Sequence, residues 1–178
     1  IAIGVTVFYT NSIIKLKDFE VQSNVVMSSL RRMNYRTQSL LTTRAPIIEI
    51  SVHWTNTLNE FERDLDGLSS YSNLSVLNDE QRQQMSELTG WWDQIYQWYY
   101  KPAIDHLQKM QGGEAGDAVG SQSILRTLLE VESSEGTPPA YLGELYTMRN
   151  YRDHIMDETQ TFSTRLIDMT TTIQKQIN

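Results

Sequence analysis

The 178-residue chain contains no cysteine, and this absence removes several classes of site at once. It can form no disulfide framework, no thiolate metal centre and no cysteine nucleophile. Histidine is also scarce, with three residues. None stands three positions after a glutamate, the spacing used by the carboxylate-bridged metal sites of helical bundles. Glu49 and His53 share a helix face, which is more often a surface contact than a metal site. The sequence therefore predicts no metal site and no cofactor.

Motifs that carry catalysis are missing as well. No segment alternates polar and apolar residues as a strand would, and the glycines near residues 112–120 follow no strand, so they form no phosphate-binding loop. No G-x-S-x-G elbow is present, and no spacing of serines and carboxylates selects a catalytic pair. We therefore expect no enzymatic activity and name no catalytic residue.

Positive charge is in the minority. Asp and Glu together number 22 against 15 Lys and Arg, which gives a formal net charge of −7. Such a balance argues against a general nucleic-acid binder or a protein that lies on anionic membranes. Any anion-binding site in this chain must therefore be local.

Turn-forming residues are concentrated in three stretches, at residues 66–73, 111–121 and 132–139. The sequence between them is helical in pattern, which predicts four helices at about 10–67, 78–111, 121–132 and 139–178. Asn78 and Ser121 are suitable N-caps for the second and third helices. We expect an all-α fold, an antiparallel up-down-up-down four-helix bundle in which the first and last helices are long.

A heptad repeat of core positions supports this prediction. In the first helix it runs without a change of phase, so we expect that helix to continue through Pro46 with a kink. Its core positions are Leu16, Phe19, Ser23, Val26, Leu30, Met33, Thr37, Leu40, Arg44, Ile47, Ser51, Trp54, Leu58, Phe61, Leu65 and Leu68. In the second helix they are Met85, Leu88, Trp92, Ile95 and Tyr99, and in the last Tyr141, Leu145, Met148, Arg152, Ile155, Thr159, Phe162, Leu166, Met169 and Ile173.

The first nine residues, Ile1–Tyr9, are nearly all apolar but too few to span a bilayer. We expect them to be the outer end of a transmembrane helix, with residues 10–178 forming one helical-bundle domain; the alternative is the start of a buried helix. From the predicted helix lengths, the first two helices form a hairpin at the top. The first and last run as a bare pair near the membrane, which favours a homodimer.

Two arginines, Arg44 and Arg152, occupy core positions of the heptads. A buried charge costs several kcal/mol unless it is paired, so each needs an internal carboxylate, a bound anion or a route to solvent. Helix lengths place Arg44 beside the kink at Pro102 and near the start of the last helix, with Arg126 closing the same layer. The predicted small-ligand pocket within one subunit therefore lies where Arg44 is level with Lys101–Ala103 of the second helix and with about Tyr141–Tyr146 of the last. The candidate ligand-binding residues of these helices are Arg44, Tyr100, Tyr146 and Arg152.

A second candidate site lies in the stretch SSLRRMNYRTQSLL, residues 28–41. One interpretation of its arginines is an ordinary solvated helix face. The more specific interpretation is an anion site formed by Arg31 and Arg36. Arg31 belongs to a semipolar stripe away from the core, which is a natural dimer face. The stripe consists of Val21, Asn24, Ser28, Arg31, Tyr35 and Gln38.

Ser29-Leu30-Arg31 followed by Tyr35-Arg36 resembles the S-L-R-x-x-x-Y-R core of the P-box in the NarX/NarQ family of bacterial nitrate/nitrite sensor histidine kinases. The run from Trp98 to Ile104 resembles, less closely, that family's W-x-x-x-x-x-P-A-L. Ser28 stands where the family usually has glycine, and Arg32-Met33 replaces Met-Gln. The resemblance implies a helical sensor domain related to PilJ-type chemoreceptor domains, with Arg31 binding a small anion between two subunits and Arg36 supporting it.

These observations predict the extracytoplasmic, periplasmic sensor domain of an inner-membrane receptor, either a histidine kinase or a methyl-accepting chemotaxis protein. It would bind a small anion, with nitrate the first choice, and relay a helix displacement across the membrane. The alternative is a ligand-free structural stalk or dimerisation module. A ferritin-like enzyme is a distant third possibility.

Overall fold

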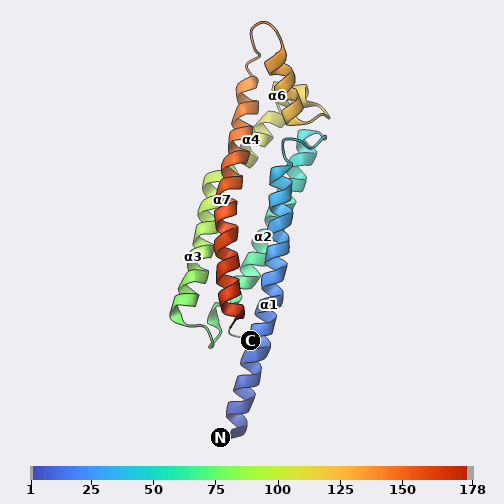
Figure 1. Cartoon of the computed structure of the whole chain (residues 1–178). Coiled ribbons are helices and arrows are strands. Elements are labelled where there is room, and N and C mark those ends of the chain that lie inside the picture. Colours follow the sequence, from blue (N-terminus) through green and yellow to red (C-terminus); the bar gives the residue numbers. More distant parts are fainter. Residues whose placement is uncertain (1, 176–178) are drawn as a thin grey trace.

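A computed structural model describes the backbone of residues 2–175 and the side chains of residues 15–175 (Figure 1). Throughout this range the chain is helical or in turns, without a strand, so the predicted all-α class is confirmed. The elements are α1 (Ala2–Gln38), α2 (Ile47–Ser69), the 3-10 helix η1 (Ser70–Asn73), α3 (Asp79–Ile95), the π-helix η2 (Tyr96–Tyr100), α4 (Lys101–Gln111), α5 (Glu114–Val119), α6 (Ile124–Ser133) and α7 (Leu142–Gln174).

The long helices run along one common axis. In Figure 1, α1 rises from the N-terminal end, α2 returns beside it, α3 and α4 rise again, and α7 descends toward the end at which α1 begins. The short helices α5 and α6 lie at the opposite end, close to the turn between α1 and α2. There the Leu125 N–H donates to the Leu41 carbonyl at 2.8 Å, which joins α6 to that turn.

The predicted continuous first helix is wrong. Helix α1 ends at Gln38, a turn occupies residues 39–46, and α2 begins at Ile47, directly after Pro46. The hydroxyls of Thr42 and Thr43 donate to the Ser39 carbonyl at 3.2 and 2.7 Å, which satisfies the end of α1 locally. Proline has no N–H to donate and disfavours helix in the residue before it, so α2 can start after Pro46 but cannot run through it.

This turn also overturns the predicted layout of the bundle ends. The connection between α2 and α3 lies toward the end where α1 begins, instead of forming an apical hairpin (Figure 1). Helix α3 therefore packs beside the last part of α7, where a bare pair of helices was expected. The predicted membrane segment Ile1–Tyr9 falls in a stretch whose side chains lie outside the described residues. In the described part of the chain, no helix combines the length and the apolarity needed to cross a bilayer.

The heptad positions nevertheless form the core. Every predicted core residue of α1 and α2 is buried, apart from Arg44 in the turn. In α7 all are buried except the half-buried Tyr141 and Arg152. The Phe61 ring on α2 lies 4.6 Å from the Trp92 ring on α3 and 6.1 Å from the Phe162 ring on α7. The expected packing of α2 against α3 is thus confirmed at this layer.

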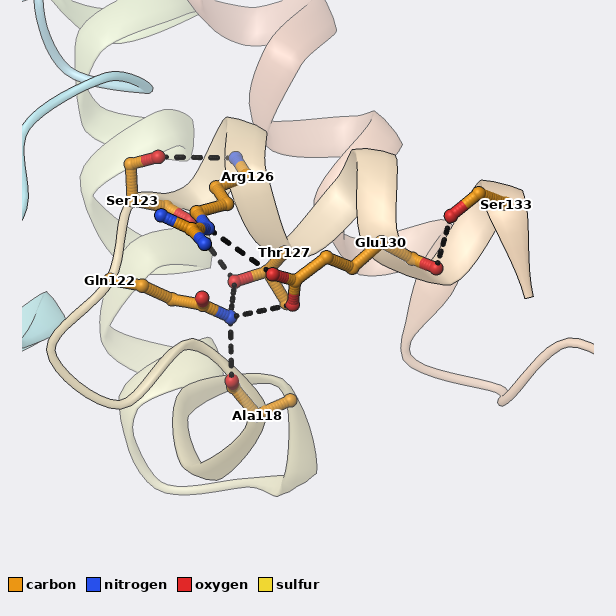
Figure 2. A network of polar contacts seen from close by, with 7 residues as sticks. All are labelled: Ala118, Gln122, Ser123, Arg126, Thr127, Glu130 and Ser133. Atoms are coloured by element: carbon orange, nitrogen blue, oxygen red, sulfur yellow. Dashed lines mark hydrogen bonds and ion pairs between the residues drawn. The ribbon is translucent and has the colours of Figure 1, made fainter.

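The caps follow local chemistry. Asn78 caps α3 as expected from the sequence, and it forms a capping box with Gln81. The cap of α6 is Ser123, two residues later than predicted, and its Oγ accepts from the Arg126 N–H at 3.1 Å (Figure 2). The short α5 lies in the stretch that we predicted as a loop.

The π-helix η2 displaces the core seam by one residue. Tyr99, the predicted core residue after Ile95, is half-buried, whereas Tyr100 is completely buried. A π-turn holds an extra residue, so the step from one core residue to the next becomes five instead of four. The seam then continues through Ala103, Leu107 and Met110. The helix therefore changes phase in the turn before Pro102.

Candidate anion-binding site

A cleft opens where the end of α1, the following turn and the first turns of α2 meet. We call it the hairpin cleft, and its volume is about 210 Å³. The turn brings the last turn of α1 back against α2, so residues up to 18 positions apart line one hollow. The lining residues are Arg36, Leu40, Thr43, Arg44, Ala45, Glu49, Ile50, His53 and Trp54.

Two predicted ligand residues, Arg36 and Arg44, meet in this cleft. Within residues 15–175, neither arginine forms an ion pair or stacks on an aromatic ring. Arg31 shares this property. The other arginines are engaged: Arg32, Arg63, Arg82, Arg126 and Arg152 with carboxylates, and Arg149 and Arg165 over aromatic rings.

The start of α2 adds positive potential to the hairpin cleft. No side chain caps this helix, and its first residues follow Pro46, which has no N–H. Unsatisfied N–H groups at a helix N-terminus carry a partial positive charge that favours anions. The acidic residue in the lining is Glu49, whose Oε1 lies 3.9 Å from His53 Nε2. Two guanidinium groups therefore face one carboxylate that is already beside an imidazole.

The floor of the hairpin cleft is rigid. Trp54 is 1% exposed, and its Nε1 donates to Thr37 Oγ1 at 2.9 Å. The Tyr100 ring lies 5.6 Å from the Trp54 ring, on the buried side. Burial raises the pKa of the Tyr100 hydroxyl strongly, an effect that the nearby Thr37 hydroxyl only partly offsets, and the Tyr100 oxygen makes no well-formed hydrogen bond. Tyr100 therefore supports the floor and does not reach the cleft.

Arg152 lies outside the hairpin cleft but contacts the end of α1, which borders the cleft. Its Nη1 donates to the Gln38 carbonyl at 3.1 Å, and its Nε donates to Asp153 Oδ1 at 2.7 Å. The need for a partner at this core position is thus met by the end of α1 and a neighbouring carboxylate. A cation at a helix C-terminus also interacts favourably with the helix dipole. The arginine ties α7 to the end of α1, two residues after Arg36.

The structure does not assemble the predicted pocket of Arg44, Tyr100, Tyr146 and Arg152. Arg44 is exposed in the turn, and Tyr146 lies on α7, with the Arg149 guanidinium 5.0 Å from its ring centroid. The neighbouring Glu132 carboxylate raises the pKa of the Tyr146 hydroxyl.

Arg126 does not close the expected layer either. Figure 2 shows its side chain turned toward Glu130 of the same helix, with Nε 3.2 Å from Oε1. Gln122 Nε2 donates to the other oxygen of that carboxylate at 3.2 Å. The guanidinium of Arg126 therefore pairs with a carboxylate of its own helix, α6.

Arg31 and Arg36 are also separated. Five helical positions turn the chain by about 140° around the α1 axis, so the two side chains leave opposite sides of the helix. Arg31 is exposed on the predicted semipolar stripe, where Val21 and Tyr35 are 64% and 68% exposed. Within one chain, Arg36 therefore combines with Arg44 and not with Arg31.

Sequence reasoning missed Thr43, His53 and the uncapped start of α2 as parts of the hairpin cleft. The signal was present in the run LLTTRAP at residues 40–46, because two threonines before a proline are typical of a turn. Comparisons of the chain with protein-family models, with curated proteins and with solved structures found no match.

Proposed function

We propose that the chain is the extracytoplasmic sensor domain of a bacterial transmembrane receptor, a sensor histidine kinase or a chemotaxis receptor, that binds a small anion. In this proposal α1, α2, the α3–α4 helix and α7 act as an up-down-up-down four-helix bundle. The P-box-like stretch around Arg31 and Arg36 motivates the receptor class and makes nitrate the first anion to test.

The observation that carries the proposal is the meeting of Arg36 and Arg44 in one open cleft, where neither forms an ion pair among residues 15–175 although Glu49 also lines the cleft. Arg36 and Arg44 are both exposed, so solvent screens part of the repulsion between their guanidinium groups, and a bound anion offsets what remains. Planar oxyanions fit the guanidinium fork with two parallel hydrogen bonds, as Arg–carboxylate pairs do. Nitrate, nitrite and small carboxylates share this geometry.

A relay can start from the same place. An anion held by Arg36 acts on the last turn of α1, whose Gln38 carbonyl accepts from Arg152 of α7 at 3.1 Å. If the anion binds one arrangement of α1 and α7 more tightly than another, it shifts the population toward that arrangement. Helix shifts of an ångström or two are typical of such transitions. In Figure 1, α1 begins and α7 ends toward the same end of the molecule, so both would carry the displacement there.

A homodimer remains part of the proposal. The face of α1 that carries Arg31 also exposes Val21 and Tyr35, at 64% and 68%. Facing Arg31 side chains across a two-fold axis would hold a second anion between subunits. The alternative function, a ligand-free stalk, gives no reason for three arginines in the second half of α1 and the following turn that form no ion pair among residues 15–175.

We expect nitrate, nitrite or acetate to raise the melting temperature of the purified chain and to give a binding isotherm by calorimetry. A ligand at about 100 times its Kd stabilises the folded state by about 2.7 kcal/mol. Charge-assisted hydrogen bonds contribute about 1.5–3 kcal/mol each, so Arg36→Ala and Arg44→Ala should each weaken binding by at least about tenfold. Arg63→Ala is the matched control, because its side chain is 77% exposed on α2 outside the cleft.

Two outcomes would contradict the assignment. If none of these anions changes the melting temperature or binds in the calorimeter, the stalk is favoured. If Arg31→Ala abolishes the response while Arg36→Ala and Arg44→Ala keep it, the anion binds at the α1 face and the hairpin cleft is not its site. Sedimentation with and without nitrate reports whether the dimer fraction follows the same variants.

A further inference from the structure

A second and larger cleft lies between α3 and α7, near the end of the molecule where α7 finishes. We call it the α3–α7 cleft, and its volume is about 340 Å³. That is within the range of about 300–1,000 Å³ typical of small-molecule sites. The lining residues are Gln84, Glu87, Leu88 and Trp91 from α3 and Arg165, Asp168, Met169 and Thr172 from α7.

The sequence places each set on one face of its helix. On both helices the lining residues follow the spacing i, i+3, i+4, i+7, which marks a single stripe. The helices are antiparallel, so Trp91 at the upper end of one stripe meets Arg165 at the upper end of the other. The Arg165 guanidinium lies 4.8 Å from the centroid of the Trp91 ring.

The inner part of the α3–α7 cleft is apolar. Leu88 and Met169 are each 6% exposed and form the bottom. The Trp91 ring is half-buried and lies 5.5 Å from the Phe162 ring of the core. A small hydrocarbon group placed on this floor would exchange water for apolar contacts, which is favourable.

The rim carries both signs of charge, and within residues 15–175 these charges do not neutralise each other. Arg165 stacks on Trp91 and forms no ion pair with Glu87 or Asp168, although Asp168 is one helical turn away. Glu87 accepts from Gln83 Nε2 at 2.9 Å, a neutral partner, and none of the described side chains donates to the Asp168 carboxylate. The cleft therefore offers a cation beside a pair of carboxylates above an apolar floor.

We propose that the α3–α7 cleft binds a zwitterionic small molecule, of the class of free α-amino acids with an apolar side chain. The ligand carboxylate pairs with Arg165, its ammonium group pairs with Asp168 and Glu87, and its side chain rests on Leu88, Met169 and Trp91. A simple anion would meet two carboxylates, and a simple cation would meet Arg165. A molecule with both charges a few ångströms apart satisfies all three groups.

This site is separate from the hairpin cleft. The hairpin cleft lies where α1 ends and α2 begins, toward the opposite end of the long helices, so the ligand of the α3–α7 cleft is independent of the proposed anion. The ligand would bridge α3 to the last turns of α7. That position allows it to hold the end of α7 in one place relative to α3.

The test is calorimetry and thermal unfolding of the full 178-residue chain with a matched set of probes. L-Leucine and L-methionine present both charges and an apolar side chain. Leucinamide lacks the carboxylate, and 4-methylpentanoate lacks the ammonium group. We expect both amino acids to bind at millimolar or lower concentration, and each truncated analogue to bind at least about tenfold more weakly, since each loses one charge-assisted pair.

Variants locate the site. Arg165→Gln and Asp168→Asn should each reduce L-leucine binding at least about tenfold, with melting temperatures close to that of the parent protein. Arg149→Gln is the control, because Arg149 makes the same kind of contact, 5.0 Å from the Tyr146 ring centroid, outside the cleft. No binding of either amino acid would overturn the proposal. So would equal binding of 4-methylpentanoate or leucinamide, or a loss caused by Arg149→Gln as large as that caused by Arg165→Gln.

Discussion

Replacing Phe61 with alanine should lower the free energy of unfolding by about 3–5 kcal/mol, the cost usually found when a buried aromatic side chain is deleted. Phe61 is 0% exposed and stands where three long helices meet. Its ring packs edge-on at 4.6 Å from the Trp92 ring and 6.1 Å from the Phe162 ring. The deletion leaves a cavity lined by these rigid rings, which cannot collapse to fill it.

The measurement is urea unfolding followed by circular dichroism, with Trp98→Ala as the control. Trp98 is 65% exposed on η2, so its removal should change the free energy of unfolding by no more than about 0.5 kcal/mol. A Phe61→Ala protein whose unfolding midpoint matches that of Trp98→Ala would mean that the three helices are not packed together at this layer.

The second large effect is expected at Thr37, whose hydroxyl organises the polar contacts behind the hairpin cleft. Thr37 Oγ1 accepts from Trp54 Nε1 at 2.9 Å and donates to the Met33 carbonyl at 2.9 Å, and all three residues are buried. Thr37→Val keeps the shape but removes the acceptor. A buried N–H without a partner costs about 1–3 kcal/mol, so the free energy of unfolding should fall by that amount.

Thr37→Ser distinguishes the contribution of the hydroxyl to stability from that of the methyl group. It keeps the acceptor and loses one buried carbon, which is worth about 0.8 kcal/mol. Both variants are measured by urea unfolding, and the indole hydrogen bond can be followed by the exchange rate of the Trp54 Nε1 proton. If Thr37→Val is no less stable than Thr37→Ser and the indole proton exchanges at the parent rate, the hydrogen bond contributes nothing to stability.

The core was predictable because burial depends on periodicity alone. The spacing of apolar residues identified nearly every buried position of α1, α2 and α7. The same spacing says nothing about the direction in which the chain runs. Leu40 in the turn and Ile47 at the start of α2 keep the heptad phase because both pack into the core. An uninterrupted heptad was therefore compatible with a chain reversal, and Pro46 was the better guide.

The hairpin cleft could not be predicted from the sequence for the same reason. Arg36 and Arg44 were both recognised as unusual cations, but their meeting depends on the reversal between them. With a straight helix they would stand about 12 Å apart along the axis. Arg152 was correctly predicted to need a partner. Its partners are the Asp153 carboxylate and a main-chain carbonyl at the end of α1, and the second acceptor exists only because the helix stops at Gln38.

Helices α3 and α4 follow one another without a break in the chain direction, but the π-helix η2 between them shifts the spacing of their core residues by one position. Ile95 and Tyr100 both face the core although five positions separate them. The chain therefore carries one spare residue at Tyr96–Tyr99. Losing one exposed residue there, such as Gln97, would turn the segment into ordinary α-helix and leave the seams above and below in register. Losing a residue anywhere else in this helix would rotate one seam by about 100° relative to the other. This stretch is where the length of the helix can change in evolution without refolding the bundle around it.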